Sequence, residues 1–200
     1  MESDTIHLLQ PSYTGNVSVE TALKKRRSVR SFSKDVISFQ ELSQILWAAN
    51  GISEKGYRTA PSAGATYPLN IYVATGNVSQ VNYGLYRYDV IYHALRRVAP
   101  YDLRSALCRA ALYQKFIEVA AADIIITAVY ERTTGRYGQR GLRYVHMEAG
   151  HVGQNISLQA VTLGLGTVMV GAFDDAMVKE IMMLQKNEEP LYIIPVGKPL

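Results

Sequence analysis

The chain has 200 residues, of which 48% are hydrophobic and 19% charged, and its formal net charge is +4 at pH 7. This composition excludes a disordered chain, and no apolar run approaches the ~20 residues of a membrane-spanning helix. We therefore expect one soluble domain over residues 1–200, with a polar lead at 1–16. The single cysteine, Cys108, and a Met1–Asp4 start without signal-peptide character predict a cytoplasmic protein.

A cluster of basic and hydroxyl side chains follows the first predicted helix, which spans 17–25 and has Ser18 as its N-cap. The cluster consists of Arg26, Arg27, Ser28 and Arg30. Arginine forks and serine hydroxyls suit phosphate oxygens. The cluster alone leaves three interpretations open: a phosphorylated small molecule, a nucleic acid, or a solvated basic face that suits the helix dipole.

The second predicted helix begins at a capping box formed by Ser38 and Glu41 and runs to residue 50. Apolar residues recur along it at helical spacing, so one face is buried. Trp47 either belongs to this core or borders a planar ligand, and the core is the commoner place for a large aromatic side chain.

A stretch of small residues follows at 59–68, bracketed by prolines, and it predicts a loop. It is either a plain connection or a place where backbone amides approach a flat ligand. Its central residues are Pro61, Ser62, Ala63, Gly64 and Ala65. A strand over 69–75 should follow, with Ile71 and Val73 on one face and Tyr72 and Ala74 on the other.

The middle of the chain predicts a hairpin, a helix and a central strand. The hairpin strands are 83–88 and 94–98, and the helix is 101–114. Cys108 lies in that helix as a buried structural thiol. The continuous apolar run at 123–130 predicts a strand buried on both faces, and residues 131–138 predict a polar loop.

The longest predicted helix covers 139–163, where apolar residues keep steps of three and four. Gly150 and Gly153 indicate close packing against another helix, within the chain or across a subunit interface. His146 and His151 are five residues apart, which is not the spacing of a helical metal site, so we expect no metal. The glycines at 164 and 166 follow a helix and precede a strand, which excludes a dinucleotide-binding fingerprint.

The C-terminal part predicts a strand at 167–171, a helix from Asp174 to residue 184, and a last strand at 191–196. The order of elements predicts an α+β sandwich, in which helices flank a small, mixed but mostly antiparallel sheet.

Four segments, in this order, resemble the FMN-dependent nitroreductases, and most of all the branch that contains azoline (thiazole- and oxazole-forming) dehydrogenases. They are 26–32, 61–68, 148–155 with 164–167, and 190–199. The resemblance covers nearly the whole chain and implies an intertwined homodimer, with FMN at the interface and the C-terminal segment reaching the partner.

The resemblance also implies roles for single residues. Arg26, Ser28 and Arg30 would bind the FMN phosphate and ribityl chain, assisted by Arg27 and Lys198. Residues 61–65 would lie along the isoalloxazine from the other subunit, and Asn70 would meet its pyrimidine edge. The backbone of Gly171 and Ala172 would face flavin N5, where a donor stabilises the reduced flavin.

The chain departs from the family pattern at two places. Many relatives have a glutamate-glycine pair where this chain has Gly171-Ala172, and a change of side chain there keeps the backbone donor. Azoline dehydrogenases use a lysine-tyrosine pair as base where this chain has Arg136-Tyr137, and arginine stays protonated. Tyr137 is then either a proton donor or a loop tyrosine.

The resemblance implies an FMN-dependent oxidoreductase that transfers two electrons as hydride at flavin N5, in a ping-pong scheme. NADH or NADPH would be the donor, and a small nitro, quinone or enone compound the acceptor. One alternative is a flavin-dependent dehydrogenase of a heterocycle or peptide-derived substrate. Others are a flavin-storing protein and, more distantly, a basic nucleic-acid-binding protein that uses residues 24–30. We expect no nucleic acid and no membrane among the partners.

Overall fold

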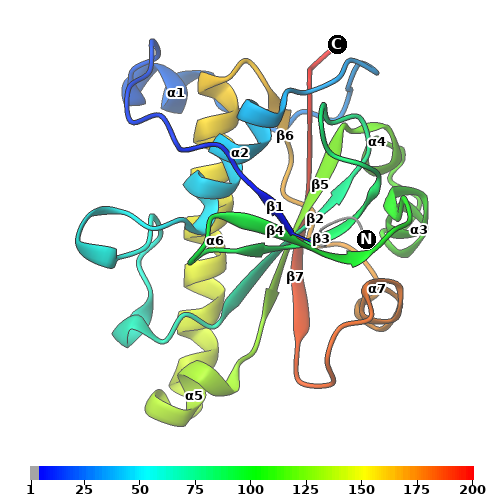
Figure 1. The fold of residues 1–200 in the computed structure, drawn as a ribbon. Helices are drawn as coiled ribbons and strands as arrows, with labels where there is room; N and C mark the ends of the chain where they lie inside the picture. The colour runs from blue at the N-terminus through cyan, green and yellow to red at the C-terminus, as the bar shows by residue number, and fades with distance from the viewer. Residues whose placement is uncertain (1–4) are drawn as a thin grey trace.

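A seven-stranded sheet runs through residues 5–200, the part of the chain that the computed structural model describes (Figure 1). The strand order is β1-β4-β3-β2-β5-β7-β6, and all of the paired neighbours are antiparallel. The strands are β1 (Thr5–His7), β2 (Leu69–Thr75), β3 (Gly84–Asp89), β4 (Ala94–Ala99), β5 (Ala122–Ala128), β6 (Gly166–Thr167) and β7 (Glu189–Gly197). The predicted α+β class is confirmed, and the ladders are all antiparallel instead of mixed.

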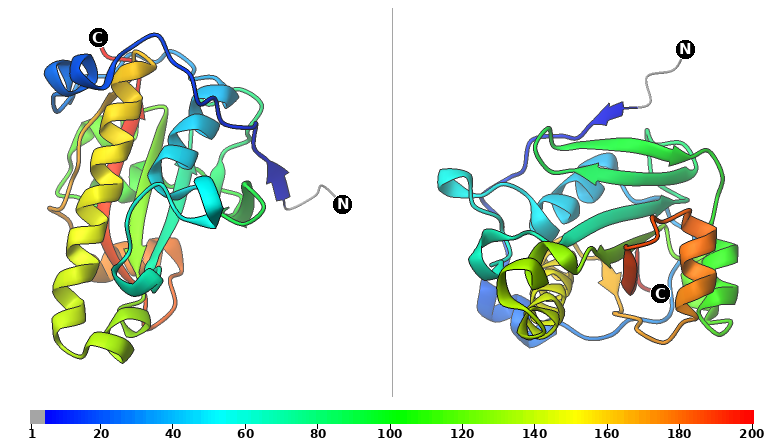
Figure 2. Two further views of the ribbon diagram at one scale, coloured as in Figure 1. Left: turned by 90° about the vertical axis from the view of Figure 1, so that its left-hand side faces the viewer. Right: turned by 90° about the horizontal axis from the view of Figure 1, so that it is seen from below.

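Helices cover both faces of this sheet (Figure 2). They are α1 (Val19–Lys25), α2 (Phe39–Asn50), α3 (Arg104–Ala110), α4 (Lys115–Val119), α5 (Glu131–Tyr137), α6 (Arg140–Thr162) and α7 (Asp175–Met182), with short 3-10 turns at η1 (Glu54–Gly56) and η2 (Ala63–Ala65). Residues of α2 and α6 form one hydrophobic core with the sheet, and residues of α3, α4 and α7 form the other.

The interior strand β5 contributes side chains to both cores. Ile124 and Ile126 face the α2/α6 core, while Ile125 faces the α3/α7 core. Every residue of β5 is buried, as its apolar run predicts. In β2 the predicted alternation is confirmed: Ile71 and Val73 lie in one core, and Tyr72 and Ala74 in the other.

Local helix signals identify three helix starts. The side chain of Ser18 accepts a hydrogen bond from the Thr21 N–H at the start of α1. Ser38 and Glu41 form the complete capping box of α2, and Asp174 caps α7. Each side chain satisfies a backbone N–H that has no partner inside its helix.

The helix predicted at 101–114 is wrong in extent, because within that range only Arg104–Ala110 form a helix, α3, and the next helix, α4, begins at Lys115. Asp102 accepts hydrogen bonds from the Arg104 N–H (3.1 Å) and guanidinium, so α3 begins only at Arg104. Leu112 and Tyr113 then adopt positive φ angles of 56° and 60°. This left-handed backbone cannot continue an α-helix, and the chain turns into α4.

The loop predicted at 131–138 is also wrong, since residues Glu131–Tyr137 form α5. Thr133 is buried, and its hydroxyl contacts that of Thr66 at 2.7 Å. Gly138, with φ of 55°, ends the helix. The contact with Thr66 joins residues far apart in the sequence, and together with packing against the adjoining helix α6 it outweighs the weak local helix propensity of this segment.

The strand predicted at 167–171 is shorter than expected. Only Gly166–Thr167 form β6, and Val170 makes a single bridge to Ile193 of β7. Within this chain, Gly153 of α6 packs against Met169 of this segment and not against another helix, since an added Cβ would lie 2.5 Å from the Met169 sulfur. Gly150 has no heavy atom within 4 Å of an added Cβ.

The N-terminal end of the chain differs from expectation as well. Part of the predicted polar lead, Thr5–His7, is the edge strand β1 and pairs with β4. Residues Met1–Asp4, used above for the signal-peptide argument, lie outside the described residues. The C-terminal segment pairs with its own chain, since Phe32 bridges Pro199 and the Leu200 N–H donates to the Ser31 carbonyl.

Asp123 is a fully buried carboxyl whose two oxygens have no hydrogen-bond partner among the described residues. Burial raises its pKa well above 3.8, against the opposing charge of Arg104. A raised pKa means that the folded state binds the proton more tightly than the unfolded state, so this group lowers stability as the pH rises above about 4.

We predict that Asp123→Asn raises the free energy of unfolding by about 1–3 kcal/mol at pH 8 and by less at pH 5. Urea denaturation of both proteins at the two pH values measures the difference. Arg104 keeps its ion pair with Asp102 (2.7 Å) in the variant, so no new unpaired cation arises there. A gain that is equal at both pH values, or a loss at pH 8, would contradict the prediction.

Candidate functional site

The basic cluster after α1 lies along the edge of the sheet at β6. Ser28 forms a bridge to Thr167, and the Val29 N–H donates to the Thr167 carbonyl at 2.9 Å. An added Cβ at Gly166 would lie 2.7 Å from Val29, so this glycine permits the close approach. The contact fixes the path of the chain between Arg26 and Arg30.

Lys198 joins this cluster from the other end of the chain. Its carbonyl accepts from the Ser33 N–H at 2.9 Å. A cavity of about 180 Å³ lies beside the cluster and is lined by Arg27, Val29, Thr167 and Pro199 among others. Among residues 5–200, no carboxylate lies within ion-pair distance of Arg26, Arg27, Arg30 or Lys198. Their charges are therefore available to an anion.

The turn at Gly171 and Ala172 lies further along the same edge. Val170 pairs with Ile193, and the Ala172 carbonyl accepts from Gln114 Nε2 at 3.1 Å. Both residues are exposed, and within the described chain neither backbone N–H has an acceptor. Gly171 follows Thr167 by four positions, which is about 13 Å of extended chain.

The small-residue loop lies at another place, against α5 and α6. The backbone has positive φ at Gly64, Ala65 and Tyr67, of 59°, 52° and 46°. The Arg136 guanidinium donates to the Gly64 carbonyl at 3.0 Å. The Tyr137 hydroxyl lies 2.5 Å from where a Gly64 Cβ would be. The helix that the sequence did not predict, α5, thus holds the predicted loop.

Glu148 of α6 contacts the small-residue loop through Ser62. It is only 3% exposed, and burial raises the pKa of its carboxyl to about 7, which a hydrogen bond from Ser62 partly offsets. The Ser62 Oγ also accepts the Tyr67 N–H at 3.0 Å. No role for Glu148 is predicted from the sequence, although its spacing from Val145 and Val152 places it on the buried face of α6.

Asn70 is apart from the basic cluster and the Gly171 turn, because β5 and β7 lie between. Its amide nitrogen donates to Glu188 at 2.7 Å, and its carbonyl accepts from Arg87 at 2.9 Å and Arg132 at 3.2 Å. The structure therefore divides the predicted residues into two groups. Arg26, Arg27, Ser28, Arg30, Gly171, Ala172 and Lys198 form the β6 group; Pro61, Ser62, Ala63, Gly64, Ala65, Asn70 and Tyr137 form the loop group.

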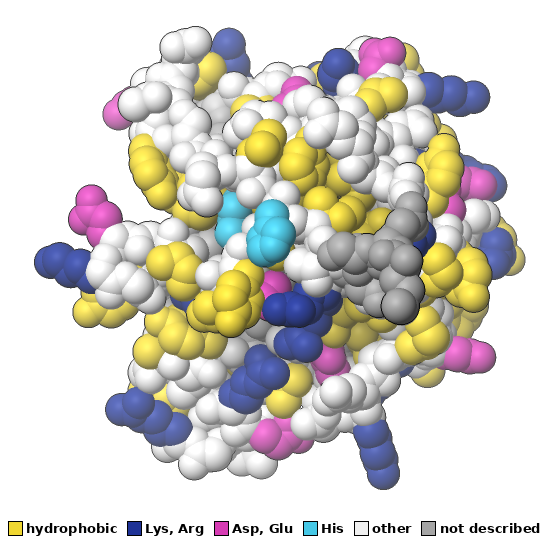
Figure 3. Space-filling model, viewed as in Figure 1, with side chains coloured by type: hydrophobic (Ala, Val, Ile, Leu, Met, Phe, Trp, Pro, Cys, Tyr) yellow, Lys and Arg dark blue, Asp and Glu magenta, His cyan; other side chains and the backbone are white. Residues whose placement is uncertain are grey.

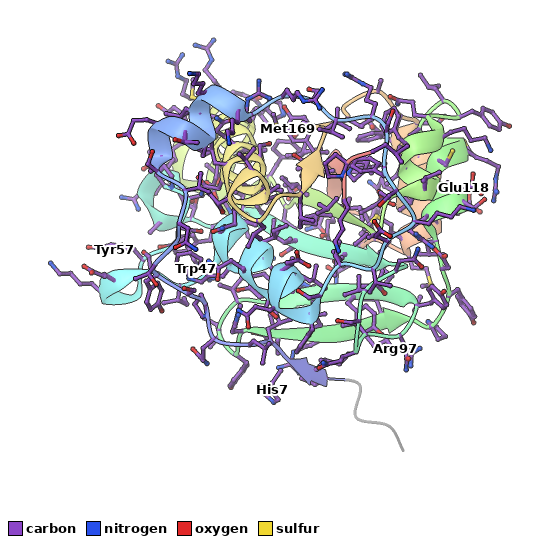
Figure 4. The ribbon with its side chains drawn as sticks, turned by 90° about the horizontal axis from the view of Figure 1, so that it is seen from above. His7, Trp47, Tyr57, Arg97, Glu118 and Met169 are labelled. Carbon is purple, nitrogen blue, oxygen red and sulfur yellow. The ribbon has the colours of Figure 1, made fainter. Side chains whose placement is uncertain are left out.

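The described part of the chain shows neither a metal site nor a membrane-spanning helix. Within residues 5–200, no three His, Cys, Asp or Glu side chains converge as they would around a metal ion. In the same range, no helix combines the length and apolar character needed to cross a membrane. Trp47 is half-buried: its Nε1 donates to the Ile52 carbonyl at 2.9 Å, and its ring lies edge-on to Tyr13. It lies on the same side of the molecule as Tyr57, away from Glu118 (Figure 4).

The chain belongs to the nitroreductase family, whose sequence profile matches residues 23–198. It is 47% identical over 198 residues to a nitroreductase-family protein of Methanocaldococcus jannaschii, with 98% of each chain covered. The protein is therefore an enzyme, an oxidoreductase, and belongs to a family whose members typically bind flavin.

Solved structures show the same fold. A nitroreductase-family protein of Ralstonia eutropha superposes with a TM-score of 0.88 at 30% identity, over 99% of this chain and 90% of that one. A chain of the E. coli microcin synthetase McbBCD complex superposes with a TM-score of 0.75 over 96% of this chain and 77% of that one. At 22% identity, the latter likeness concerns the fold alone.

We predict that Gly64→Ala destabilises the protein more than Gly56→Ala does. Both glycines have positive φ, which costs alanine about 1–2 kcal/mol. Only the Cβ at Gly64 would also displace Tyr137 and Arg136, whereas nothing lies within 4 Å at Gly56. Urea denaturation and limited proteolysis of the loop measure the two effects. Equal losses in the two variants would show that α5 does not hold the loop.

Proposed function

We propose that the protein is a homodimeric, FMN-dependent oxidoreductase that passes electrons from NADH or NADPH to a small nitro, quinone or enone compound. The observation that carries the proposal is the β6 group: cations without carboxylate partners and exposed backbone donors lie along one sheet edge. FMN, when bound, would supply two-electron hydride chemistry at N5 in a ping-pong scheme.

The residues of the β6 group fit FMN from end to end. Arg26, Arg27, Ser28, Arg30 and Lys198 would hold the phosphate and ribityl chain, because guanidinium and hydroxyl groups donate to phosphate oxygens. The free N–H of Gly171 or Ala172 would donate to the flavin at N5. The cations and the Gly171 turn lie one after the other along the sheet edge, as the phosphate and the ring of one FMN molecule would require.

The division into two groups supports the homodimer. Residues 61–65 are small enough for a flat ring to lie against them, and in one chain they contact α5 and α6 instead of β6. A second chain could bring its loop to the first chain's flavin. Exposed apolar side chains on α1 and α6, namely Val19, Leu23, Leu142 and Met147, give that partner a surface to cover.

Oxidation of a heterocycle is less well supported than reduction of an acceptor. Arg136 occupies the position of a base, stays protonated, and already donates to the Gly64 carbonyl. Tyr137 lies against the same loop, so the pair acts as a clamp in our proposal. The single cysteine, Cys108, is buried and free, which supports a cytoplasmic location in this proposal.

The first test is spectroscopic. We expect purified protein to carry FMN, and NADH or NADPH to bleach the flavin absorbance under anaerobic conditions. A suitable acceptor should then restore it. Protein that neither contains FMN nor binds it when added would refute the proposal. Bound flavin that neither nucleotide reduces would instead favour a storage role.

We predict that Arg30→Ala lowers FMN affinity about tenfold or more, because a charge-assisted hydrogen bond contributes about 1.5–3 kcal/mol. Fluorescence titration of the apoprotein with FMN measures the change. Arg109→Ala is the matched control, since that exposed arginine donates to Ser105 in α3, away from β6. Equal FMN affinity of the two variants would rule out Arg30 as a phosphate ligand.

A further inference from the structure

The sheet opens between β2 and β3 at one end. These strands pair only from Tyr72 to Thr75 and from Gly84 to Arg87. Before Tyr72, β2 pairs only with β5, and after Arg87, β3 pairs only with β4. A cavity of about 310 Å³ lies at this opening, and another of about 270 Å³ adjoins it. Asn70, Arg87 and Arg132 line both cavities.

The larger cavity has an excess of positive charge. Four arginines line it, Arg58, Arg87, Arg96 and Arg132, together with one carboxylate, Asp89. Asp89 is already bound to Arg96 at 2.7 Å. Within residues 5–200, the other three arginines have no carboxylate at ion-pair distance. Figure 3 shows basic side chains gathered near the middle of this face, over the region of β2, β3 and β4.

The three arginines are held in place by neutral groups. Arg87 and Arg132 both donate to the Asn70 carbonyl, and Arg132 also donates to the Tyr67 carbonyl at 3.2 Å. Arg58 lies over the Tyr67 ring at 5.0 Å and donates to the Asn50 carbonyl. Each guanidinium has five N–H donors, and these contacts use only one or two of them. Burial also lowers the pKa of Arg58, since its charge is partly removed from water.

Glu188 is the nearest buried carboxylate to Asn70, and it is already occupied. It accepts hydrogen bonds from Asn70, Tyr72 and Thr127. It thereby fixes the orientation of the Asn70 amide, which in turn presents its carbonyl oxygen to Arg87 and Arg132. Glu188 thus organises the arginines from behind Asn70 without closing an ion pair to either of them.

We propose that this cavity binds the oxyanion of a small molecule, a carboxylate or a phosphate, and so selects anionic substrates. The cavity has the volume of a small-molecule site and contains preorganised forks that match an oxyanion. Tyr67 lines it and ends the loop 61–67, which connects the cavity to the surface assigned to the flavin ring. The proposed oxyanion binding depends only on the cavity and its arginines. The role in substrate selection rests on the proposed oxidoreductase function.

The test compares a charged ligand with a neutral one of similar size. FMN-saturated full-length protein is titrated calorimetrically with 4-nitrobenzoate and with 4-nitrobenzyl alcohol. We expect the wild type to bind the carboxylate at least about tenfold more tightly than the alcohol. Arg132→Gln and Arg58→Gln should each remove most of this preference, and Arg109→Gln should leave it unchanged.

The outcomes separate this proposal from the function itself. Equal affinities for the two ligands in the wild type, or a preference that survives in both cavity variants, overturns the anion site. Loss of the preference in Arg30→Ala alone also overturns it, since the anion would then bind at the β6 group. A persistent preference in protein whose flavin no nicotinamide nucleotide reduces leaves the anion site intact and refutes the oxidoreductase scheme. Arg132 is exposed on a surface helix, so its variant should fold.

Discussion

The docking of residues 28–33 between Thr167 and the C-terminal segment is the constraint on which the rest of the site depends. Phe32 is only 4% exposed, and an added Cβ at Gly197 would lie 3.2 Å from its ring. Val29 packs even more closely on Gly166, where an added Cβ would lie 2.7 Å from it. Two apolar side chains therefore anchor a segment whose arginine, Arg30, is exposed, and glycines on β6 and β7 make room for these apolar side chains. Hydrophobic packing, and not the charges, sets the position of the basic cluster.

The sequence predicts those elements whose stabilising groups are neighbours in the chain. The Ser18 cap and the box of Ser38 and Glu41 act over three residues, and α1 and α2 begin where these signals place them. The apolar run of β5 is equally local. By contrast, α5 depends on Thr66 and on α6, and the break after α3 depends on positive φ angles at Leu112 and Tyr113. Leucine and tyrosine rarely adopt positive φ angles, so neither residue signals this break in the sequence.

The candidate site divides in the same way. The basic cluster and the Gly171 turn could be identified because each is a contiguous motif. Glu148 lies inside a recognised motif, but its burial against Ser62 arises only when α6 meets the loop. Arg58, Arg87 and Arg132 come from three separate segments, and each one looks like an ordinary surface arginine in the sequence. Their common cavity follows from the divergence of β2 and β3, which no residue pattern signals.

The charge at this opening is costly to the fold, and the cost argues for a ligand. Arg87 and Arg132 share the Asn70 carbonyl as a neutral acceptor and repel each other, and partial burial of Arg58 weakens the screening that water provides there. A fold that needed only to close the opening could pair these side chains with carboxylates or replace them with apolar ones. Instead, Glu188 accepts a hydrogen bond from the Asn70 amide and so orients it, and the Asn70 carbonyl oxygen then accepts from two of the arginines. Local rules are broken in folded proteins mainly where function requires it. An anion would supply the missing negative charge and would turn the mutual repulsion into binding energy.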